Sequence, residues 1–284
     1  DLDRDLAAGV RDADVIVAVM GLTSDLEGEE MPVKVEGFEG GDRTTLALPA
    51  DQIAFLEKAK ATGKPLILVM MNGSAIDLGW AKDNAAAILE AWYPGQSGGL
   101  AIANVLSGKA DPGGRLPLTF YHSVDDLPPF TDYSMEGRTY RYFRGAPVYP
   151  FGHGLSYTRF RYAPLVVEPI DGAVEKGLRV TTWITNVGQR PGDEVAQLYI
   201  TPPAFEGAPR TALRGFQRLS LKAGESRAIS FTLSPRDLSF VTMAGDRMLI
   251  PGNYDLSVGG GQPGTQAPVE RARYTIGKAM PLPK

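Results

Sequence analysis

Two patterns of hydrophobic and polar positions divide this chain. In its first part, short runs that are apolar at every position alternate with amphipathic stretches. The runs predict strands and the amphipathic stretches predict helices. The strands are expected at 14–20, at 65–71 and, more weakly, at 86–92, and the helices at 1–8, 49–62 and 97–107. Buried strands that alternate with helices indicate a parallel sheet with helices on both faces. We therefore predict an α/β fold for this part of the chain.

The second pattern begins near residue 165, where apolar and polar residues alternate in short segments. These segments predict half-buried strands, and they lie at 178–184, 194–200, 226–233 and 252–258. Glycine-containing turns separate them, which is typical of an immunoglobulin-like β-sandwich. We expect Trp183 and Tyr199 to be core residues of this sandwich.

Between the two patterns, residues 117–160 are rich in Pro, Tyr, Arg and Gly and show little periodicity. A long segment of this kind is either functional or packed along a domain surface. We predict an α/β domain at 1–120, a linker at 121–162 and the β-sandwich at 163–284. The aromatic residues of the linker could also stack on a sugar ring.

The segment that follows the first predicted strand, residues 21–44, is strongly acidic. Between Asp25 and Glu39 it carries six carboxylates and a single base, Lys34. The carboxyl end of a buried strand is where open α/β sheets place their ligands. Crowded carboxylates raise one another's pKa, and a carboxyl group that stays protonated near neutrality can act as a general acid. A solvated loop and a cation site are the alternatives, although the acidic spacing is not that of an EF-hand.

Composition narrows the possible functions of this 284-residue chain. Hydrophobic residues make up 43% and charged residues 22%, which is typical of a folded globular protein. The net charge of −4 argues against a nucleic-acid partner. The absence of cysteine excludes disulfides and thiolate metal sites without indicating a compartment. No apolar run approaches the length of a membrane span.

Several motifs together resemble family 3 glycoside hydrolases, the β-glucosidase and β-xylosidase family. They occur in the order of that family, and each alone is a weak match. They are Leu26-Glu-Gly-Glu-Glu30, Gly40-Gly-Asp-Arg43, Leu46-Ala-Leu-Pro49, Tyr93-Pro-Gly-Gln-Ser-Gly-Gly99, Asp111-Pro-Gly-Gly-Arg-Leu-Pro117 and Tyr149-Pro-Phe-Gly-His-Gly-Leu-Ser-Tyr157. The resemblance implies that the first domain is part of an α/β sandwich and that the last is fibronectin type III-like.

In that family a glutamate on the acidic loop is the general acid/base. Glu27 matches it best, with Glu29 and Glu30 as alternatives, and Asp42 and Arg43 would pair to fix the base of the loop. The nucleophilic aspartate lies on a separate (β/α)8 barrel, which takes about 250 residues. The resemblance therefore implies a C-terminal half that needs a barrel polypeptide as partner. The partner would also cover an exposed sheet edge.

The implied reaction is retaining hydrolysis of terminal β-D-glucosyl or β-D-xylosyl residues, which needs two carboxylates and water but no cofactor or metal. The sequence does not distinguish glucose from xylose or single out substrate-binding residues. We predict a periplasmic or secreted location.

Two other functions remain open. The chain could be a non-catalytic carbohydrate-binding or scaffolding fragment, since such a fragment needs no nucleophile. An esterase fits Gly95-Gln-Ser-Gly-Gly99, a G-x-S-x-G match that would use Ser97, His153 and one of Asp125, Asp126 and Asp132. Pro94 interrupts the strand that such a nucleophile turn requires, so we expect these glycines to serve close packing instead.

Overall fold

The computed structural model describes residues 2–283, which form two compact units. The units interleave along the chain. The first contains residues 1–104, 120–128 and 145–149, and the second contains 105–119, 129–144 and 150–284. The stretch predicted as a linker therefore contributes to both units.

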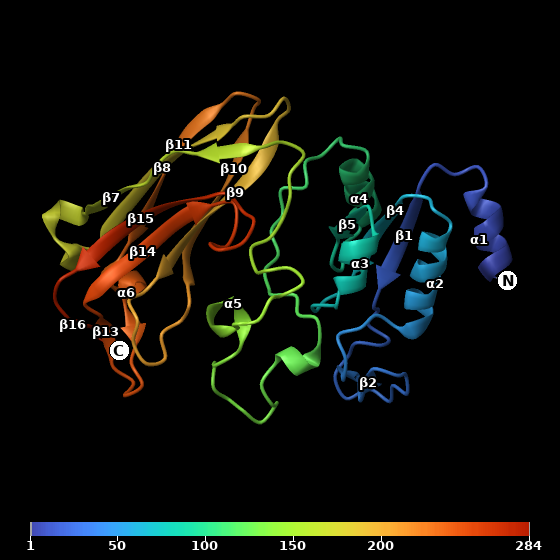
Figure 1. Cartoon of the computed structure of the whole chain (residues 1–284), viewed down its shortest axis with the longest axis horizontal. Coiled ribbons are helices and arrows are strands. Elements are labelled where there is room, and N and C mark those ends of the chain that lie inside the picture. Colours follow the sequence, from blue (N-terminus) through green and yellow to red (C-terminus); the bar gives the residue numbers. More distant parts are fainter. Residues whose placement is uncertain (1, 284) are drawn as a thin grey trace. The chain divides into compact units, whose positions relative to one another are not determined.

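The first unit is built on a small parallel sheet with strand order β1-β4-β5 (Figure 1). Its strands are β1 (Ile16–Gly21), β4 (Leu66–Met71) and β5 (Ala87–Glu90). Its helices are α1 (Leu2–Val10), α2 (Ala50–Ala61), α3 (Gly79–Asn84) and α4 (Gly98–Leu106). The predicted α/β fold is confirmed, although α3 and the short hairpin of β2 (Phe38–Glu39) and β3 (Asp42–Arg43) were not predicted. Asp1, where the first helix was predicted to begin, lies outside the described residues.

Local sequence explains why these elements begin and end where they do. Pro49 directly precedes α2, where its fixed φ suits a helix start, and Gly63 follows it with φ +76°, the left-handed conformation that glycine tolerates. Strand β4 lies in the middle of the sheet and is buried along most of its length, which explains its continuous apolar run. Strand β1 lies at the edge, and Val17 and Val19 are exposed on one of its faces. Helices were expected to cover both faces of the sheet, but among the described residues one face of β1 is left uncovered.

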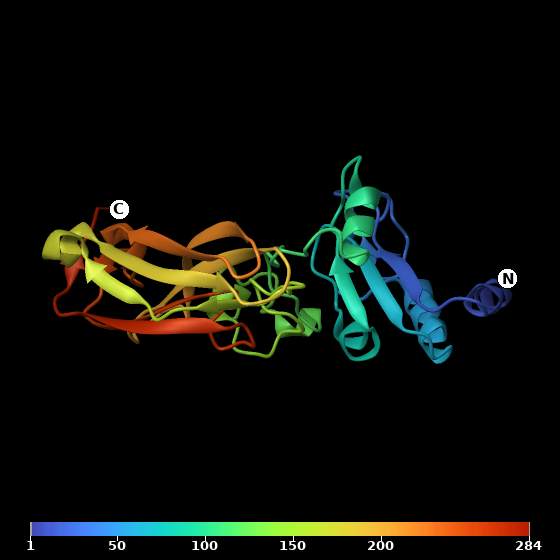
Figure 2. The same ribbon diagram turned by 90° about the horizontal axis from the view of Figure 1, so that it is seen from above.

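The second unit is a β-sandwich of two antiparallel sheets, seen as two layers in Figure 2. One sheet has the order β10-β9-β14-β15, formed by Ala212–Leu221, Gly192–Thr201, Gly252–Gly259 and Val269–Ile276. The other has the order β11-β8-β6, formed by Ser226–Leu233, Leu178–Asn186 and Phe160–Tyr162, and β7 (Val166–Pro169) also pairs with β8. The remaining elements are β12 (Phe240–Val241), β13 (Arg247–Leu249), β16 (Met280–Pro281), α5 (Thr139–Tyr142), α6 (Pro235–Leu238) and 3₁₀ turns at Val124–Asp126, Ile170–Gly172 and Val174–Lys176.

Alternation along the strands decides which side chains enter the sandwich core. On β8, Val180 and Ile184 are fully buried in the core, and Trp183 points the other way with 54% of its surface exposed. The prediction that Trp183 is a core residue is therefore wrong, because the period of two places it on the outer face. Tyr199 is buried, as predicted, but it lies one position from the core residues Leu198 and Ile200 and so faces outward from its sheet.

Tyr199 is buried because the segment before the sandwich packs on the outer face of its sheet. The ring of Tyr140 stacks on Phe151, with 4.3 Å between ring centroids, and meets Tyr199 edge-on at 6.0 Å. The side-chain amide of Gln197 donates to the carbonyl of Gly152 at 3.1 Å. These aromatic residues of the predicted linker therefore pack against the sandwich.

A buried ion pair ties the same segment to the sheet. Arg115 donates to Glu194 at 2.8 Å, with side-chain exposures of 8% and 4%, and also to the carbonyl of Gly260 at 3.1 Å. Burial raises the pKa of Glu194, and the Arg115 charge opposes that rise. A buried charge without its partner is costly, so this pair specifies where the segment docks.

Candidate functional site

The acidic segment leaves the sheet at the carboxyl end of β1, at Gly21. This glycine has φ +142°, and a Cβ atom there would lie 1.8 Å from the carbonyl oxygen of Met71 on the neighbouring strand. The side-chain amide of Gln52, on α2, makes two hydrogen bonds to the backbone of Gly21. It accepts from the Gly21 N–H at 2.9 Å and donates to the Gly21 carbonyl at 2.8 Å. The direction in which the segment leaves the sheet is therefore fixed by a close backbone approach and by one helix side chain.

The β2–β3 hairpin returns the segment to the sheet and packs against its acidic part. Gly41, with φ +91°, approaches so closely that a Cβ atom would lie 1.5 Å from the carbonyl oxygen of Gly28. The N–H of Met31 donates to the carbonyl of Gly40 at 2.8 Å. Gly28 lies between Glu27 and Glu29, so the hairpin holds the backbone that carries the candidate acids.

Glu27 lies where the loops after all three parallel strands meet. Its carboxylate accepts hydrogen bonds from the hydroxyl of Ser74, in the loop after β4, and from the hydroxyl of Tyr93, after β5, at 2.9 Å. The carboxyl ends of the strands of a parallel sheet share one edge, which explains how residues 27, 74 and 93 come together. Both carboxylate oxygens of Glu27 are therefore engaged by the unit itself.

Arg43 fixes the base of the loop through neutral acceptors. Its guanidinium donates to the Ser74 hydroxyl at 3.2 Å, to the Ala75 carbonyl at 3.1 Å and to the Ala47 carbonyl at 3.2 Å. Burial lowers the pKa of Arg43, and the nearby Glu27 charge partly offsets this. Asp42, which was expected to pair with Arg43, is exposed in β3, so the hydrogen bonds of Arg43 go to Ser74 and to backbone carbonyls instead.

Glu29 and Glu30, the alternatives to Glu27, are both exposed. Neither side chain makes a hydrogen bond or ion pair to another residue within 2–283. Glu30 has φ +51°, an uncommon conformation for a residue with a side chain, so the loop turns sharply immediately after Glu29. The three glutamates therefore differ: Glu27 is held in place, and the other two are free to meet a ligand or a partner.

Behind Ser74 lies a pair of polar residues, Asn72 and Glu90, that the residue patterns did not indicate as site residues. Asn72 is fully buried and donates to the Ser74 carbonyl at 2.8 Å, and it also lies 3.5 Å from the carboxyl group of Glu90. Glu90 accepts from the N–H of Trp92, a residue with φ +55°. Burial raises the pKa of Glu90 to about 7. A polar residue at the carboxyl end of each predicted strand was the signal that could have identified this pair.

Tyr93 completes the network and remains a hydrogen-bond donor. Burial, followed by the hydrogen bond to Glu27, raises the pKa of Tyr93 to about 12. A Cβ atom at Gly73 would lie 2.8 Å from the Tyr93 ring, so the small residue at this position lets the ring reach Glu27. The arrangement can position an acidic segment accurately at the sheet edge. It can also present exposed carboxyl groups for proton transfer.

The other sequence candidates lie elsewhere. Ser97 is exposed at the start of α4 in the first unit, whereas His153 belongs to the second unit. The Asp126 carboxylate accepts from the backbone N–H of His122. The Asp125 carboxylate accepts from the Ser123 hydroxyl, and the backbone N–H of Asp125 donates to the same hydroxyl. Within residues 2–283, no cluster of three or more His, Asp or Glu side chains could hold a metal ion. Among the same residues, no helix is both long and apolar enough to cross a membrane.

The fold and the site define the chain as an α/β domain with a loop site at the carboxyl ends of its strands, joined to a β-sandwich. Residues 2–157 match the glycosyl hydrolase family 3 C-terminal domain, and residues 194–262 match a fibronectin type III-like domain. The chain therefore belongs to glycosyl hydrolase family 3.

Curated relatives agree with this assignment. A xylan 1,4-β-xylosidase from Xylanibacter ruminicola is 43% identical over 258 residues, which is 90% of this chain and 30% of that relative. A periplasmic β-glucosidase from Salmonella typhimurium is 35% identical over 262 residues, covering 88% of this chain and 33% of that relative. The chain thus spans about a third of the length of these relatives.

Solved structures show the same fold. A β-glucosidase from Erythrobacter marinus superposes with a TM-score of 0.81 at 33% identity, over 96% of this chain and 36% of that one. A family 3 β-glucosidase from Bifidobacterium adolescentis gives a TM-score of 0.81 at 30% identity, over 95% and 40% of the two chains. The predicted family, the α/β fold and the fibronectin type III-like domain are confirmed.

Proposed function

We propose that this chain supplies the general acid/base of a retaining β-glycosidase that removes terminal β-D-xylosyl or β-D-glucosyl residues. The nucleophile would come from a (β/α)8 barrel that completes the site. Support comes from the relatives, whose names are those of β-xylosidases and β-glucosidases. The observation that carries the proposal is the acidic segment after β1, which hydrogen bonds from the loops after β4 and β5 hold at the sheet edge.

The sequence selects Glu27 as the acid/base, and the contacts support Glu29 better. An acid must offer its proton to the leaving oxygen and later accept one from water. The oxygens of Glu27 already accept hydrogen bonds from Ser74 and Tyr93, whereas Glu29, two residues further along, is exposed and unpartnered among the described residues. In this arrangement Glu27 holds the loop and Glu29 transfers the proton, with Glu30 as the remaining alternative.

Separate Gln substitutions at residues 27, 29 and 30 test this assignment in the protein that combines this chain with its barrel. The acid/base variant should lose turnover of an alkyl β-xyloside by about 10²–10⁴-fold. For an aryl substrate whose leaving group needs no protonation, it should keep most of kcat/KM but lose kcat, because hydrolysis of the glycosyl-enzyme lacks its general base. Azide, which needs no general base, should restore that kcat. A variant that only loosens the loop should slow both substrates, without rescue by azide.

The control is Glu36→Gln, which removes an exposed carboxylate from the same segment and should leave turnover unchanged. Unchanged turnover in all three test variants would refute the acid/base proposal. It would favour a non-catalytic role for the chain.

We also propose a periplasmic or secreted location. Support comes from the Salmonella relative, which is described as periplasmic. Fractionation of the producing cells tests this, and recovery of the protein only with cytoplasmic markers would contradict it.

A further inference from the structure

Asn72 joins the loops that follow β4 and β5. It comes directly after the last residue of β4 and is fully buried. Its side-chain amide donates to the Ser74 carbonyl at 2.8 Å and lies 3.5 Å from the carboxyl group of Glu90, the last residue of β5. Glu90 in turn accepts from the backbone N–H of Trp92 at 3.2 Å. One asparagine and one carboxyl group therefore hold the first turns of both loops.

The same two loops carry the hydrogen-bond donors that hold Glu27. Ser74 lies two residues after Asn72, and Tyr93 lies three residues after Glu90. The hydroxyl groups of Ser74 and Tyr93 donate to different oxygens of the Glu27 carboxylate. A carboxylate can accept both hydrogen bonds only when the two donors are correctly spaced. Asn72 and Glu90 therefore lie directly behind the two contacts that orient Glu27.

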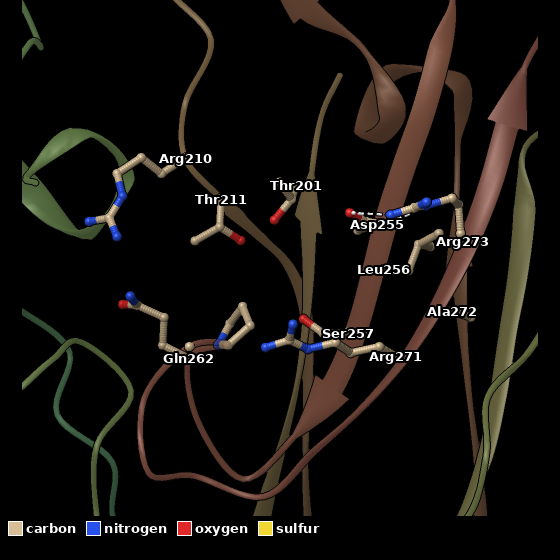
Figure 3. A pocket seen from close by; sticks show the side chains of 12 residues that line it. Thr201, Arg210, Thr211, Asp255, Leu256, Ser257, Gln262, Arg271, Ala272 and Arg273 are labelled. Carbon is tan, nitrogen blue, oxygen red and sulfur yellow. Dashed lines mark hydrogen bonds and ion pairs between the residues drawn. The ribbon is translucent and has the colours of Figure 1, made fainter. Parts of the chain in front are cut away.

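The burial of Asn72 makes its contacts more sensitive to substitution than polar contacts at the protein surface. In the cavity of the sandwich sheet shown in Figure 3, Asp255 pairs with Arg273, although 47% and 61% of these side chains are exposed. Exposed ion pairs of this kind contribute little, because water solvates both groups when the pair opens. At Asn72 no exposed surface is available to water. A substitution there should therefore leave buried backbone groups without a partner.

The protonation of Glu90 suits its place beside Asn72. Burial raises the pKa of Glu90 to about 7, against the opposing effect of its hydrogen bonds. A neutral carboxyl group carries an O–H donor, whereas a carboxylate can only accept. The side-chain oxygen Oδ1 of Asn72 is a buried acceptor with no hydrogen-bond partner among the described residues. The neutral form of Glu90 thus brings a donor next to an acceptor that lacks one.

We propose that Asn72 and Glu90 are positioning residues for the acid/base segment. They set the spacing of the two hydroxyl groups that orient Glu27 and, through the backbone, the exposed Glu29 two residues further on. This inference rests on the proposed acid/base function of that segment. Misplacing a reacting group by about 1 Å can cost about 10²-fold in rate, so side chains that never touch the substrate can still control turnover.

Steady-state kinetics of Asn72→Ala test the inference in the protein that combines this chain with its barrel. For an alkyl β-xyloside, whose leaving group needs protonation, kcat/KM should fall about 10- to 100-fold. For an aryl substrate that needs no protonation, kcat/KM should fall less than about threefold, although kcat should fall because attack by water uses the same carboxylate. A variant that merely folds poorly would lower kcat/KM for both substrates by the same factor. That result would overturn the inference.

Asn84→Ala is the matched control. Asn84 belongs to α3 of the same unit, and its side-chain amide also donates to one backbone carbonyl, that of Trp80 at 2.9 Å. The variant should leave kcat/KM for both substrates unchanged. The same difference between alkyl and aryl substrates in Asn84→Ala would contradict a specific role for Asn72.

Substitutions of Glu90 give a second test that does not depend on the stability of Asn72→Ala. Glu90→Gln keeps an acceptor for the Trp92 N–H and supplies an N–H donor in place of the O–H of the neutral acid, so it should keep at least about half of kcat/KM for the alkyl substrate. Glu90→Ala removes both groups and should show the same substrate difference as Asn72→Ala. Equal kcat/KM in Glu90→Gln and Glu90→Ala would overturn the inference.

Amide hydrogen exchange over residues 22–30 distinguishes this inference from the acid/base proposal. Exchange there should accelerate in Asn72→Ala and Glu90→Ala but not in Asn84→Ala, because only the first two release the acidic segment. If the glutamate variants keep full turnover while exchange accelerates, the acid/base proposal fails and the pair still positions the segment. If a glutamate variant loses turnover while the Asn72 and Glu90 variants keep both normal exchange and normal turnover, this inference alone fails.

Discussion

The two units bury their apolar surface in different ways, and the difference explains where the candidate acid is found. In the sandwich, two sheets enclose a continuous core in which Leu198, Ile200 and Leu256 are fully buried. In the α/β unit the small sheet has an edge strand, β1, with Val17 and Val19 exposed at 45% and 56%. The loop at the end of that strand is held mainly by close glycine contacts and by hydrogen bonds from Gln52, Ser74, Tyr93 and Arg43. A site built on polar contacts can respond to ligand and pH in ways that a closed apolar core cannot.

The largest expected effect comes from the core of the sandwich. Leu198→Ala removes a fully buried side chain between the two sheets and should lower the free energy of unfolding by about 3 kcal/mol. Val19→Ala on the exposed face of β1 should change it by less than about 0.5 kcal/mol. Denaturant unfolding of both variants measures the contrast. Equal losses would show that β1 is covered as thoroughly as the sandwich core, which would break the comparison.

A second test concerns the glycine contacts of the acidic loop. Gly41→Ala places a methyl group against the carbonyl of Gly28 in a left-handed conformation, and should destabilise the loop by about 2 kcal/mol. Gly40→Ala is the control, because Gly40 also has a positive φ of +61° but has open space around it. Amide hydrogen exchange over residues 21–44 should accelerate more in Gly41→Ala than in Gly40→Ala. Identical exchange would mean that the hairpin does not hold the segment.

A third test concerns the pH response of Glu90. Its pKa is raised from 4.5 in the unfolded chain to about 7 in the fold, so the folded state binds the extra proton between these values. Unfolding releases that proton, so the contribution of Glu90 to stability is greatest below pH 4.5 and is lost as the pH rises through 7, by on the order of 3 kcal/mol. Glu90→Gln should remove this fall. Thermal unfolding at pH 5 and pH 8 compares the two proteins, and an equal decrease in both would assign the response to other groups.

Much of this molecule could be predicted from residue patterns, for local reasons. Side chains repeat every 3.6 residues along a helix and every two along a strand, so the sequence shows which positions can be buried together. This pattern predicted the helix at 50–61 and the strands at 66–71, 178–186 and 252–259. Order and spacing of the motifs also indicated the family. Trp183 shows that residue type alone does not predict burial. It was expected in the core as a large aromatic residue, but its position in the alternation of β8 places it on the exposed face.

Sequence by itself therefore determined several of the longer helices and strands, the two kinds of fold and the acidic segment that carries Glu27, Glu29 and Glu30. Only the tertiary structure decided which glutamate is held by Ser74 and Tyr93, because residues 47 and 66 positions apart meet only when parallel strands align their ends. It also brought together Asn72 and Glu90. Side chains that meet across strands leave no periodic trace in the chain, since their contact depends on register and on three-dimensional packing.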